Sequence, residues 1–204
     1  MGIPLVHFST DYIFDGTKEG PYTIYDQPNP LGVYGRSKLL GEQYILWLLR
    51  KFYLVRTTWM FGTYGKNFID TMLEIAQKQQ KISVVNDQRG CPTWTRQLAE
   101  AVADLIVTGR YGVYHITSSE PTTWFNFAKE IYNRALSHRL CHLHDRAFIP
   151  ITTAEYPTDA KRPKYSTLSK TKIKKTLNRD IRTWELALDC CLAELSRERM
   201  KKNA

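Results

Sequence analysis

The order of two short apolar runs and the segment between them constrains the fold more than any other feature of the chain. The first run, residues 3–8, lacks polar alternation, which is typical of a strand buried on both faces of a parallel sheet. A segment rich in Gly, Pro, Asp and Tyr follows, and a helix that is apolar nearly all round, and therefore buried, is predicted over residues 33–50. Residues 52–57 predict a second strand. Strand, loop, helix and strand in this order indicate an α/β fold.

The alternation continues along the chain. Apolar residues at helical spacing predict further helices over residues 67–79, 95–109, 123–131 and 184–195. Short strands are predicted over residues 82–85 and 113–117. The whole pattern is that of an α/β protein without internal repeats.

Composition and charge exclude several classes of protein. A hydrophobic share of 43% in 204 residues is enough to bury a sizeable core. The sequence has no apolar run of membrane length and no secretory signal at its start, so we expect a cytoplasmic protein without a membrane partner. Of the net charge of +9, most comes from residues 161–204, with thirteen Lys/Arg against five Asp/Glu. The basic residues of this segment are not regularly interleaved with aromatic residues, as they would be in a protein that binds single-stranded nucleic acid. This favours a solvated face or a surface that attracts an anionic small molecule.

The cysteines predict reduced thiols rather than disulfides or a metal site. Cys91, Cys141, Cys190 and Cys191 include no C-x-x-C pair, and adjacent cysteines rarely bridge each other. Residues 141–145 read Cys-His-Leu-His-Asp, but no distant ligand pair completes a cluster. We therefore predict no metal site.

Tyr34 and Lys38 are the first candidates for chemistry, because their spacing places them on one face of the predicted helix. A lysine ammonium one turn away stabilises the phenolate, so the pair can act as a general acid. A hydroxyl from Ser9 or Thr10, at the carboxyl end of the first strand, can hydrogen-bond the same substrate oxygen. One Tyr-x-x-x-Lys is expected by chance in such a chain, so the surrounding motifs matter more.

Five motifs make the chain resemble one family. They are STDYIFDG at 9–16, YGRSKLLGE at 34–42, RTTW at 56–59, NDQRGCPT at 86–93 and YPTDAKRP at 156–163. In order and spacing they are similar to the dTDP-4-dehydrorhamnose reductases, which are extended short-chain dehydrogenase/reductases. The resemblance implies the C-terminal portion of a Rossmann-type doubly wound parallel sheet with a smaller, interleaved substrate-binding subdomain. Residues 1–80 would be the C-terminal half of the NAD(P)-binding domain, and residues 81–204 mainly the substrate-binding subdomain.

The resemblance implies reduction of the 4-keto group of dTDP-4-dehydro-L-rhamnose by NADPH or NADH, with a dTDP-sugar as substrate. By position, Thr10 is similar to the family's catalytic hydroxyl, Tyr34 to its proton donor and Lys38 to the residue that tunes the tyrosine. The implied cofactor contacts are Tyr34, Lys38 and Thr58. The implied substrate contacts are Thr10, Asp11, Tyr12, Trp59, Asn67, Gln88 and Arg162. Structural roles compete equally for three of these: Trp59 as core, Asp11 as a turn cap and Asn67 as a helix N-cap.

The sequence departs from the family in two respects. Arg96 follows the Pro-Thr motif where some members have an acidic metal ligand. No Gly-x-x-Gly-x-x-Gly turn, which cradles a dinucleotide pyrophosphate, occurs anywhere in the chain. The residues that read the adenosine ribose would lie in the missing part, so the resemblance implies NADPH or NADH without a preference. We therefore expect an N-terminally truncated chain, inactive alone, that self-associates or takes a partner chain supplying the missing half of the sheet.

Two alternatives to an enzyme stay open at the level of the sequence. A non-enzymatic regulatory subunit is one, because the β subunit of methionine adenosyltransferase resembles the same reductases and acts by binding a partner enzyme. A decayed gene product without activity is the other.

Overall fold

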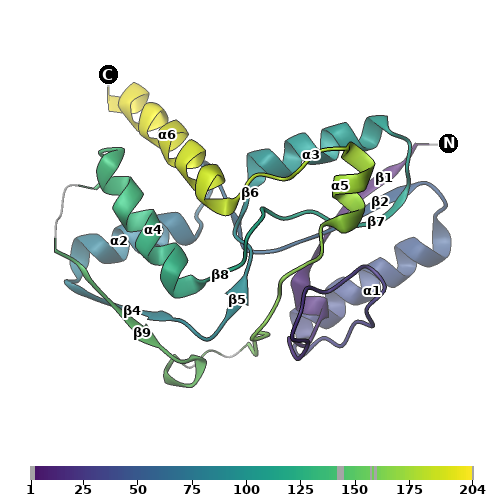
Figure 1. The fold of residues 1–204 in the computed structure, drawn as a ribbon, viewed down its shortest axis with the longest axis horizontal. Coiled ribbons are helices and arrows are strands. Elements are labelled where there is room, and N and C mark those ends of the chain that lie inside the picture. Colours follow the sequence, from purple (N-terminus) through teal and green to yellow (C-terminus); the bar gives the residue numbers. More distant parts are fainter. Residues whose placement is uncertain (1–2, 142–144, 157, 159, 204) are drawn as a thin grey trace.

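A computed structural model describes residues 3–141, 145–156, 158 and 160–203. One part of the molecule is built on a sheet of three parallel strands in the order β1-β2-β7, seen on the right of Figure 1. The strands are β1 (Leu5–Thr10), β2 (Phe52–Thr57) and β7 (Gly112–His115). Thr10 pairs with Thr57, so the polar carboxyl ends of β1 and β2 lie side by side. The predicted α/β fold with a parallel sheet is confirmed.

The prediction that residues 3–8 are buried on both faces is wrong, because β1 ends the sheet in the described part of the chain and Leu5 and Phe8 are 39% and 41% exposed. Strand β2 is the one buried on both faces, because its alternate side chains enter different apolar clusters. Leu54 packs with Ile45 of α1 (Val33–Leu48) on one face. Val55 packs on the other face, in a cluster that includes side chains of α3 (Thr95–Val107) and α5 (Thr171–Leu177). Helices therefore cover both faces of the sheet, as Figure 1 shows.

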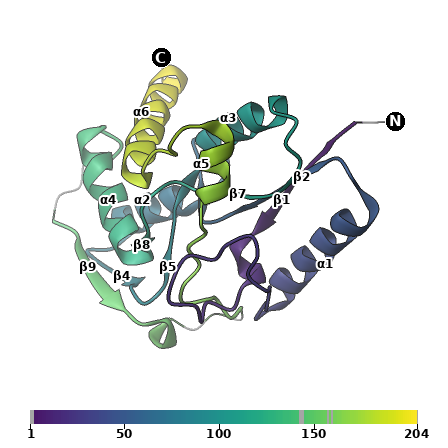
Figure 2. The same ribbon diagram turned by 45° about the vertical axis from the view of Figure 1, so that its right-hand side comes forward.

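A second group of elements lies beside this sheet (Figure 2). It consists of α2 (Phe68–Lys78), α4 (Trp124–Ser137), α6 (Trp184–Asn203) and the parallel pair β4 (Lys81–Val85) and β9 (Ala147–Ile151). Their apolar side chains share one buried cluster, which also takes in Phe61 and Trp94. The chain enters this group with α2, returns to the first sheet with α3 and β7, and enters it again with α4. The division of the chain at residue 80 stays a prediction.

Short elements connect the two groups. Strand β3 (Met60–Phe61) pairs with β6 (Thr93–Trp94), and β5 (Arg89–Gly90) pairs with β8 (Thr122–Thr123). Turns η1 (Asp11–Ile13) and η2 (Thr153–Glu155) follow β1 and β9. The Arg89 N–H donates to the carbonyl of Lys164 at 2.8 Å, and the Ser166 N–H donates to the carbonyl of Arg89 at 2.8 Å. The segment near residue 165 is thereby held next to β5.

The prediction that the helix after residue 33 is buried is wrong. The buried residues of α1 form one stripe, Gly35, Glu42 and Ile45. On the opposite side Trp47 is 83% exposed and Val33 75% exposed. The physical reason is that α1 packs on β1, which ends the sheet in the described part of the chain, so few elements surround the helix.

Candidate active site

Thr10 and Asp11 lie where β1 ends. The Thr10 Oγ1 accepts a hydrogen bond from the N–H of Tyr12 at 3.2 Å, so Thr10 rather than Asp11 caps turn η1. The Thr10 hydroxyl donates to Oδ1 of Asp11 at 3.1 Å. Both residues are buried. For Thr10 to donate to a substrate oxygen, its hydroxyl must leave Asp11.

The environment of Asp11 favours its neutral form. Burial raises the pKa of this carboxyl to about 6, although hydrogen bonds with Ser166 and Thr10 oppose the shift. Asp11 therefore changes charge close to neutral pH, next to the candidate catalytic hydroxyl.

Tyr34 and Lys38 stand beside the same strand end. The Lys38 Nζ donates to the carbonyl oxygen of Phe8 at 3.3 Å. The ring of Tyr34 lies edge-on to that of Tyr12, with centroids 5.8 Å apart. Gly35 permits this approach, because a Cβ there would overlap the carbonyl oxygen of Tyr12. Tyr34 is 52% exposed, so its phenol is open to an incoming ligand.

Thr58 has a different environment. Its hydroxyl donates to the carbonyl of Cys91 at 2.5 Å, and the residue is buried. This bond ties the loop after β2 to the segment after β5. A cofactor contact by Thr58 stays a prediction.

Trp59 is held between two neighbours. Its indole stacks on that of Trp124, with ring centroids 3.7 Å apart and planes inclined by 11°. On another side, a Cβ added at Gly90 would come within 2.5 Å of the Trp59 ring. Trp59 has a φ of 42°, a left-handed conformation that is unusual for a bulky residue and often marks functional sites. It is a half-buried aromatic in a fixed position, and its contact with a sugar stays a prediction.

Asn67 is the N-cap of α2. Its Oδ1 accepts from the N–H of Ile69 at 3.0 Å, and Asp70 completes a capping box. Its Nδ2 donates to the carbonyl of Gly62 at 2.9 Å. The structural role weighed for Asn67 is confirmed, and a substrate contact stays a prediction.

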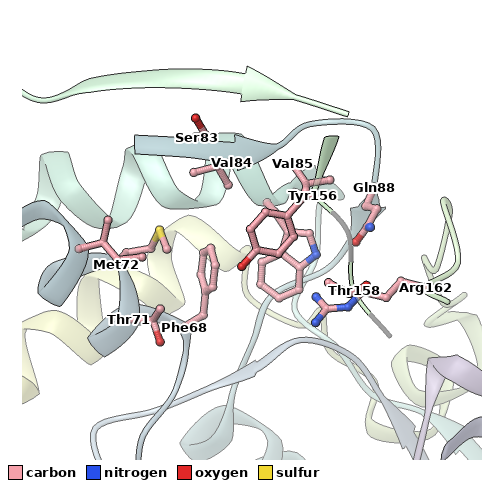
Figure 3. A pocket seen from close by; sticks show the side chains of 12 residues that line it. Phe68, Thr71, Met72, Ser83, Val84, Val85, Gln88, Tyr156, Thr158 and Arg162 are labelled. Atoms are coloured by element: carbon pink, nitrogen blue, oxygen red, sulfur yellow. The ribbon is translucent and has the colours of Figure 1, made fainter. Parts of the chain in front are cut away.

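A cavity of about 240 Å³ opens between α2, β4 and the segment after residue 155 (Figure 3). It is lined by Phe68, Thr71, Met72, Ile75, Ser83, Val84, Val85, Gln88, Trp124, Tyr156, Thr158 and Arg162. The lining combines aromatic and aliphatic walls with one guanidinium and one carboxamide. Such a mixture is typical of a site for an organic ligand with a flat apolar part and an anionic part.

Gln88 is fixed in this cavity by a chain of hydrogen bonds. Its Nε2 donates to Oγ1 of Thr153 at 3.0 Å, and the Thr153 hydroxyl donates to Asp87 at 2.6 Å. The nitrogen is thus engaged, and the carboxamide oxygen is the atom that can accept from a ligand.

The predicted residues fall into two neighbouring groups. Tyr34, Lys38 and Tyr12 surround the end of β1, whereas Gln88 and Arg162 line the cavity. Arg162 links the two groups, because its charge acts on Tyr12. Burial and the Asp11 carboxylate raise the pKa of the Tyr12 phenol, and the Arg162 charge opposes this rise.

Trp124 is the main site residue that sequence reasoning missed. Its helical spacing with Phe127 and Ile131 indicated a core residue. The structure places it both against Trp59 and in the cavity lining. One signal was present in the sequence: Trp124 directly follows Thr123, the N-cap of α4, and helix ends tend to lie at the surface.

Parallel strands with helices on both faces, and polar groups gathered at the carboxyl ends of β1 and β2, define an α/β protein of the Rossmann type. The model of the family described as RmlD substrate binding domain matches residues 1–197. The chain belongs to this family.

Two curated relatives illustrate the similarity. The dTDP-4-dehydrorhamnose reductase of Aggregatibacter actinomycetemcomitans is 41% identical over 191 residues, which cover 90% of this chain and 64% of the relative. The dTDP-4-dehydrorhamnose reductase of Burkholderia thailandensis is 39% identical over 206 residues, which cover 96% of this chain and 69% of the relative. The chain therefore spans about two thirds of the length of these relatives.

Solved structures agree in fold. A dTDP-4-dehydrorhamnose reductase from Clostridium acetobutylicum superposes with a TM-score of 0.86 at 38% identity, covering 93% of this chain and 65% of the other. The enzyme from Bacillus anthracis, in complex with NADP, gives a TM-score of 0.84 at 35% identity, with the same coverage.

Two further features concern the described residues alone. Across those residues, the helices lack the combination of length and apolar character needed to cross a bilayer. No group of three or more His, Cys, Asp or Glu side chains suited to a metal ion was found among them. Residues 142–144 of the Cys-His-Leu-His-Asp segment lie outside the described part.

Proposed function

We propose that the chain carries the proton-transfer and substrate-binding part of a reductase that converts dTDP-4-dehydro-L-rhamnose to dTDP-L-rhamnose with NADPH or NADH. Its relatives bear the name dTDP-4-dehydrorhamnose reductase, and one was solved with NADP. These relatives do not favour the alternative of a non-enzymatic regulatory subunit.

The observation that carries the proposal is the position of Lys38 and Tyr34 beside the end of β1. The Lys38 ammonium donates to the Phe8 carbonyl, and the Tyr34 ring lies against Tyr12, two residues after Thr10. In the proposed reaction the Tyr34 phenol donates its proton to the 4-keto oxygen of the substrate. The Lys38 ammonium, one helical turn away, stabilises the phenolate that forms. The Thr10 hydroxyl turns from Asp11 to the same oxygen and orients it.

NADPH or NADH, when bound, supplies the hydride to the carbonyl carbon. The exposed phenol of Tyr34 and the neighbouring Lys38 ammonium fit the nicotinamide ribose, which carries hydroxyl groups for both. The sequence holds no Gly-x-x-Gly-x-x-Gly turn for the pyrophosphate. The residues present therefore fit the nicotinamide end of the cofactor.

The cavity fits the nucleotide of the substrate. Arg162 offers a guanidinium to the diphosphate, for which bidentate hydrogen bonds are favourable. Phe68, Tyr156 and Trp124 offer flat surfaces to a pyrimidine ring, and the Gln88 oxygen offers an acceptor to its N–H.

Self-association, or docking of a chain that completes the sheet, is part of the proposal. It is supported by the position of β1 at the edge of its sheet in the described part of the chain, and by the exposed apolar side chains of α1, among them Val33, Leu40 and Trp47.

Calorimetric titration of the 204-residue chain with dTDP tests the substrate part of the proposal. We expect binding, and a loss of about tenfold or more in affinity for Arg162→Ala, because a charge-assisted contact to the diphosphate is removed. Arg50→Ala, at an exposed arginine after α1, is the matched control and should bind like the parent chain. Absence of dTDP binding, or equal affinity in Arg162→Ala, would contradict the nucleotide assignment.

Oxidation of NADPH in the presence of dTDP-4-dehydro-L-rhamnose tests the reaction. Tyr34→Phe should abolish any turnover that the chain shows, alone or with a partner that completes the sheet, because the proton donor is lost. Full activity in that variant would remove Tyr34 from the mechanism.

A further inference from the structure

Lys38 and Glu42 stand four residues apart on α1, the spacing at which helical ion pairs form. They nevertheless have other partners. The Lys38 ammonium donates to the carbonyl of Phe8, whereas the Glu42 carboxylate accepts from Arg56 of β2. The Arg56 Nε lies 3.0 Å from Oε1 and its Nη2 lies 2.6 Å from Oε2. Both side chains of this ion pair are buried, at 5% and 1% exposure.

The guanidinium of Arg56 is also fixed from its other side. Its Nη1 lies 3.4 Å from Nε2 of His115. Because a guanidinium only donates, that nitrogen accepts, and the Nδ1–H of His115 donates to the carbonyl of Tyr22 at 3.1 Å. Burial and the Arg56 charge lower the pKa of His115 to about 3, which keeps the ring neutral. Arg56 further lies over the ring of Phe14, 5.5 Å from its centroid.

We propose that Arg56 is a positioning residue of the reductase site, which draws the Glu42 carboxylate into a buried ion pair and thereby keeps the Lys38 ammonium free of a carboxylate and available to Tyr34. This inference rests on the proposed function, because the role of Tyr34 belongs to it.

The charges around α1 explain why a partner for Glu42 is needed. A buried carboxylate without a partner is costly, and the nearest cation along the helix would be Lys38. An ion pair between them would cancel the positive charge that the Tyr34 phenolate requires. His7 of β1 faces the same region, and burial and Lys38 lower the pKa of His7 against the opposite influence of Glu42. A neutral His7 adds no competing charge.

The experiment follows the ionisation of Tyr34 in the 204-residue chain, by NMR of chains labelled with ¹³C at tyrosine Cζ. The Tyr34 resonance is assigned with Tyr34→Phe. Arg56→Met should move the ionisation midpoint of Tyr34 up by about one pH unit, because the freed Glu42 carboxylate neutralises Lys38. Glu42→Gln should leave the midpoint close to the parent value, because Lys38 then has no carboxylate to pair with. The double variant Glu42→Gln/Arg56→Met should return it close to the parent value.

Two further variants separate this role from a general structural one. In a Lys38→Met background, Arg56→Met should add little further shift, because the ammonium through which Arg56 acts is absent. Arg134→Met, which breaks a helical ion pair with Glu130 on α4, is the matched control and should leave Tyr34 unchanged. Far-UV circular dichroism checks that each variant is folded.

An unchanged midpoint in folded Arg56→Met overturns the proposal, as does an equal shift in the Lys38→Met background. If Arg56→Met does not fold, Arg56→Gln, which removes the same charge, is measured in its place and judged by the same criterion. The ionisation of Tyr34 does not depend on catalysis, so failure of the nucleotide or turnover tests would be recognised separately.

Discussion

The indole rings of Trp59 and Trp124 stack 3.7 Å apart, although the residues come from distant parts of the chain. Trp59 follows the end of β2, beside the strand that carries Thr10. Trp124 lines the cavity that contains Gln88 and Arg162. The stack therefore joins the loop after β2 to the proposed nucleotide cavity.

Removing one indole should be visible without any ligand. Two stacked indoles give an exciton signal in far-UV circular dichroism, and Trp124→Phe should remove it. The same variant should weaken dTDP binding severalfold, because an aromatic wall of the cavity becomes smaller. Trp47→Phe is the matched control, since Trp47 is 83% exposed on α1. An unchanged exciton signal in Trp124→Phe would show that the rings do not stack in solution.

A side chain at Gly90 should displace the Trp59 ring, because a Cβ there would come within 2.5 Å of it. We expect Gly90→Ala to destabilise the chain by about 1–3 kcal/mol, the usual cost of overpacking. Urea unfolding measures the difference. Gly20→Ala is the control, because no heavy atom lies within 4 Å of a Cβ at that position. Equal stability of the two variants would mean that the Trp59 ring moves aside without destabilising the folded chain.

Asp11 should make stability fall as pH rises through about 6. Burial raises the pKa of its carboxyl to about 6 in the folded chain, from 3.8 when unperturbed. Because the folded chain holds this proton more tightly, the contribution is fully present below the unfolded pKa and is lost as pH rises. Asp11→Asn should therefore gain up to about 3 kcal/mol over the parent at about pH 7.5, and much less at about pH 4.

Denaturant unfolding at both pH values checks this difference. Asp15 provides a control of opposite sign, because a hydrogen bond from the backbone of Thr17, together with bonds from Asn29 and other neighbours, lowers the pKa of its half-buried carboxyl to about 2. Asp15→Asn should lose stability relative to the parent above the unfolded pKa. A pH-independent effect of Asp11→Asn would refute the raised pKa.

The outward face of α1 should govern association of the chain. Trp47→Ser combined with Val33→Ser should lower the apparent mass in light scattering, because the apolar contacts available to a second copy shrink. Val107→Ser, at a side chain of α3 that is 86% exposed, is the matched control. If the parent chain is monomeric at high concentration, the proposal that this face of α1 mediates self-association is wrong.

Part of the site could be predicted from local patterns. Tyr34 and Lys38 share a helix face, and Thr10 ends a strand, so periodicity alone places each of them. Gln88 and Arg162 were predicted only through resemblance, because neither lies in a regular pattern that reveals its direction. Trp124 was missed because an aromatic residue at helical spacing has the same pattern whether it packs in a core or lines a cavity.

By itself the sequence determined the alternation of strands and helices and the motifs that surround Thr10 and Tyr34, because these depend on neighbours a few residues apart. It did not determine which strand is buried on both faces, since β2 and not β1 has that position. Only the tertiary structure decided that Glu42 pairs with Arg56 rather than with Lys38, that Trp59 meets Trp124, and that α1 is exposed. The physical reason is that local spacing offers each side chain several partners, and the packing of distant segments selects among them.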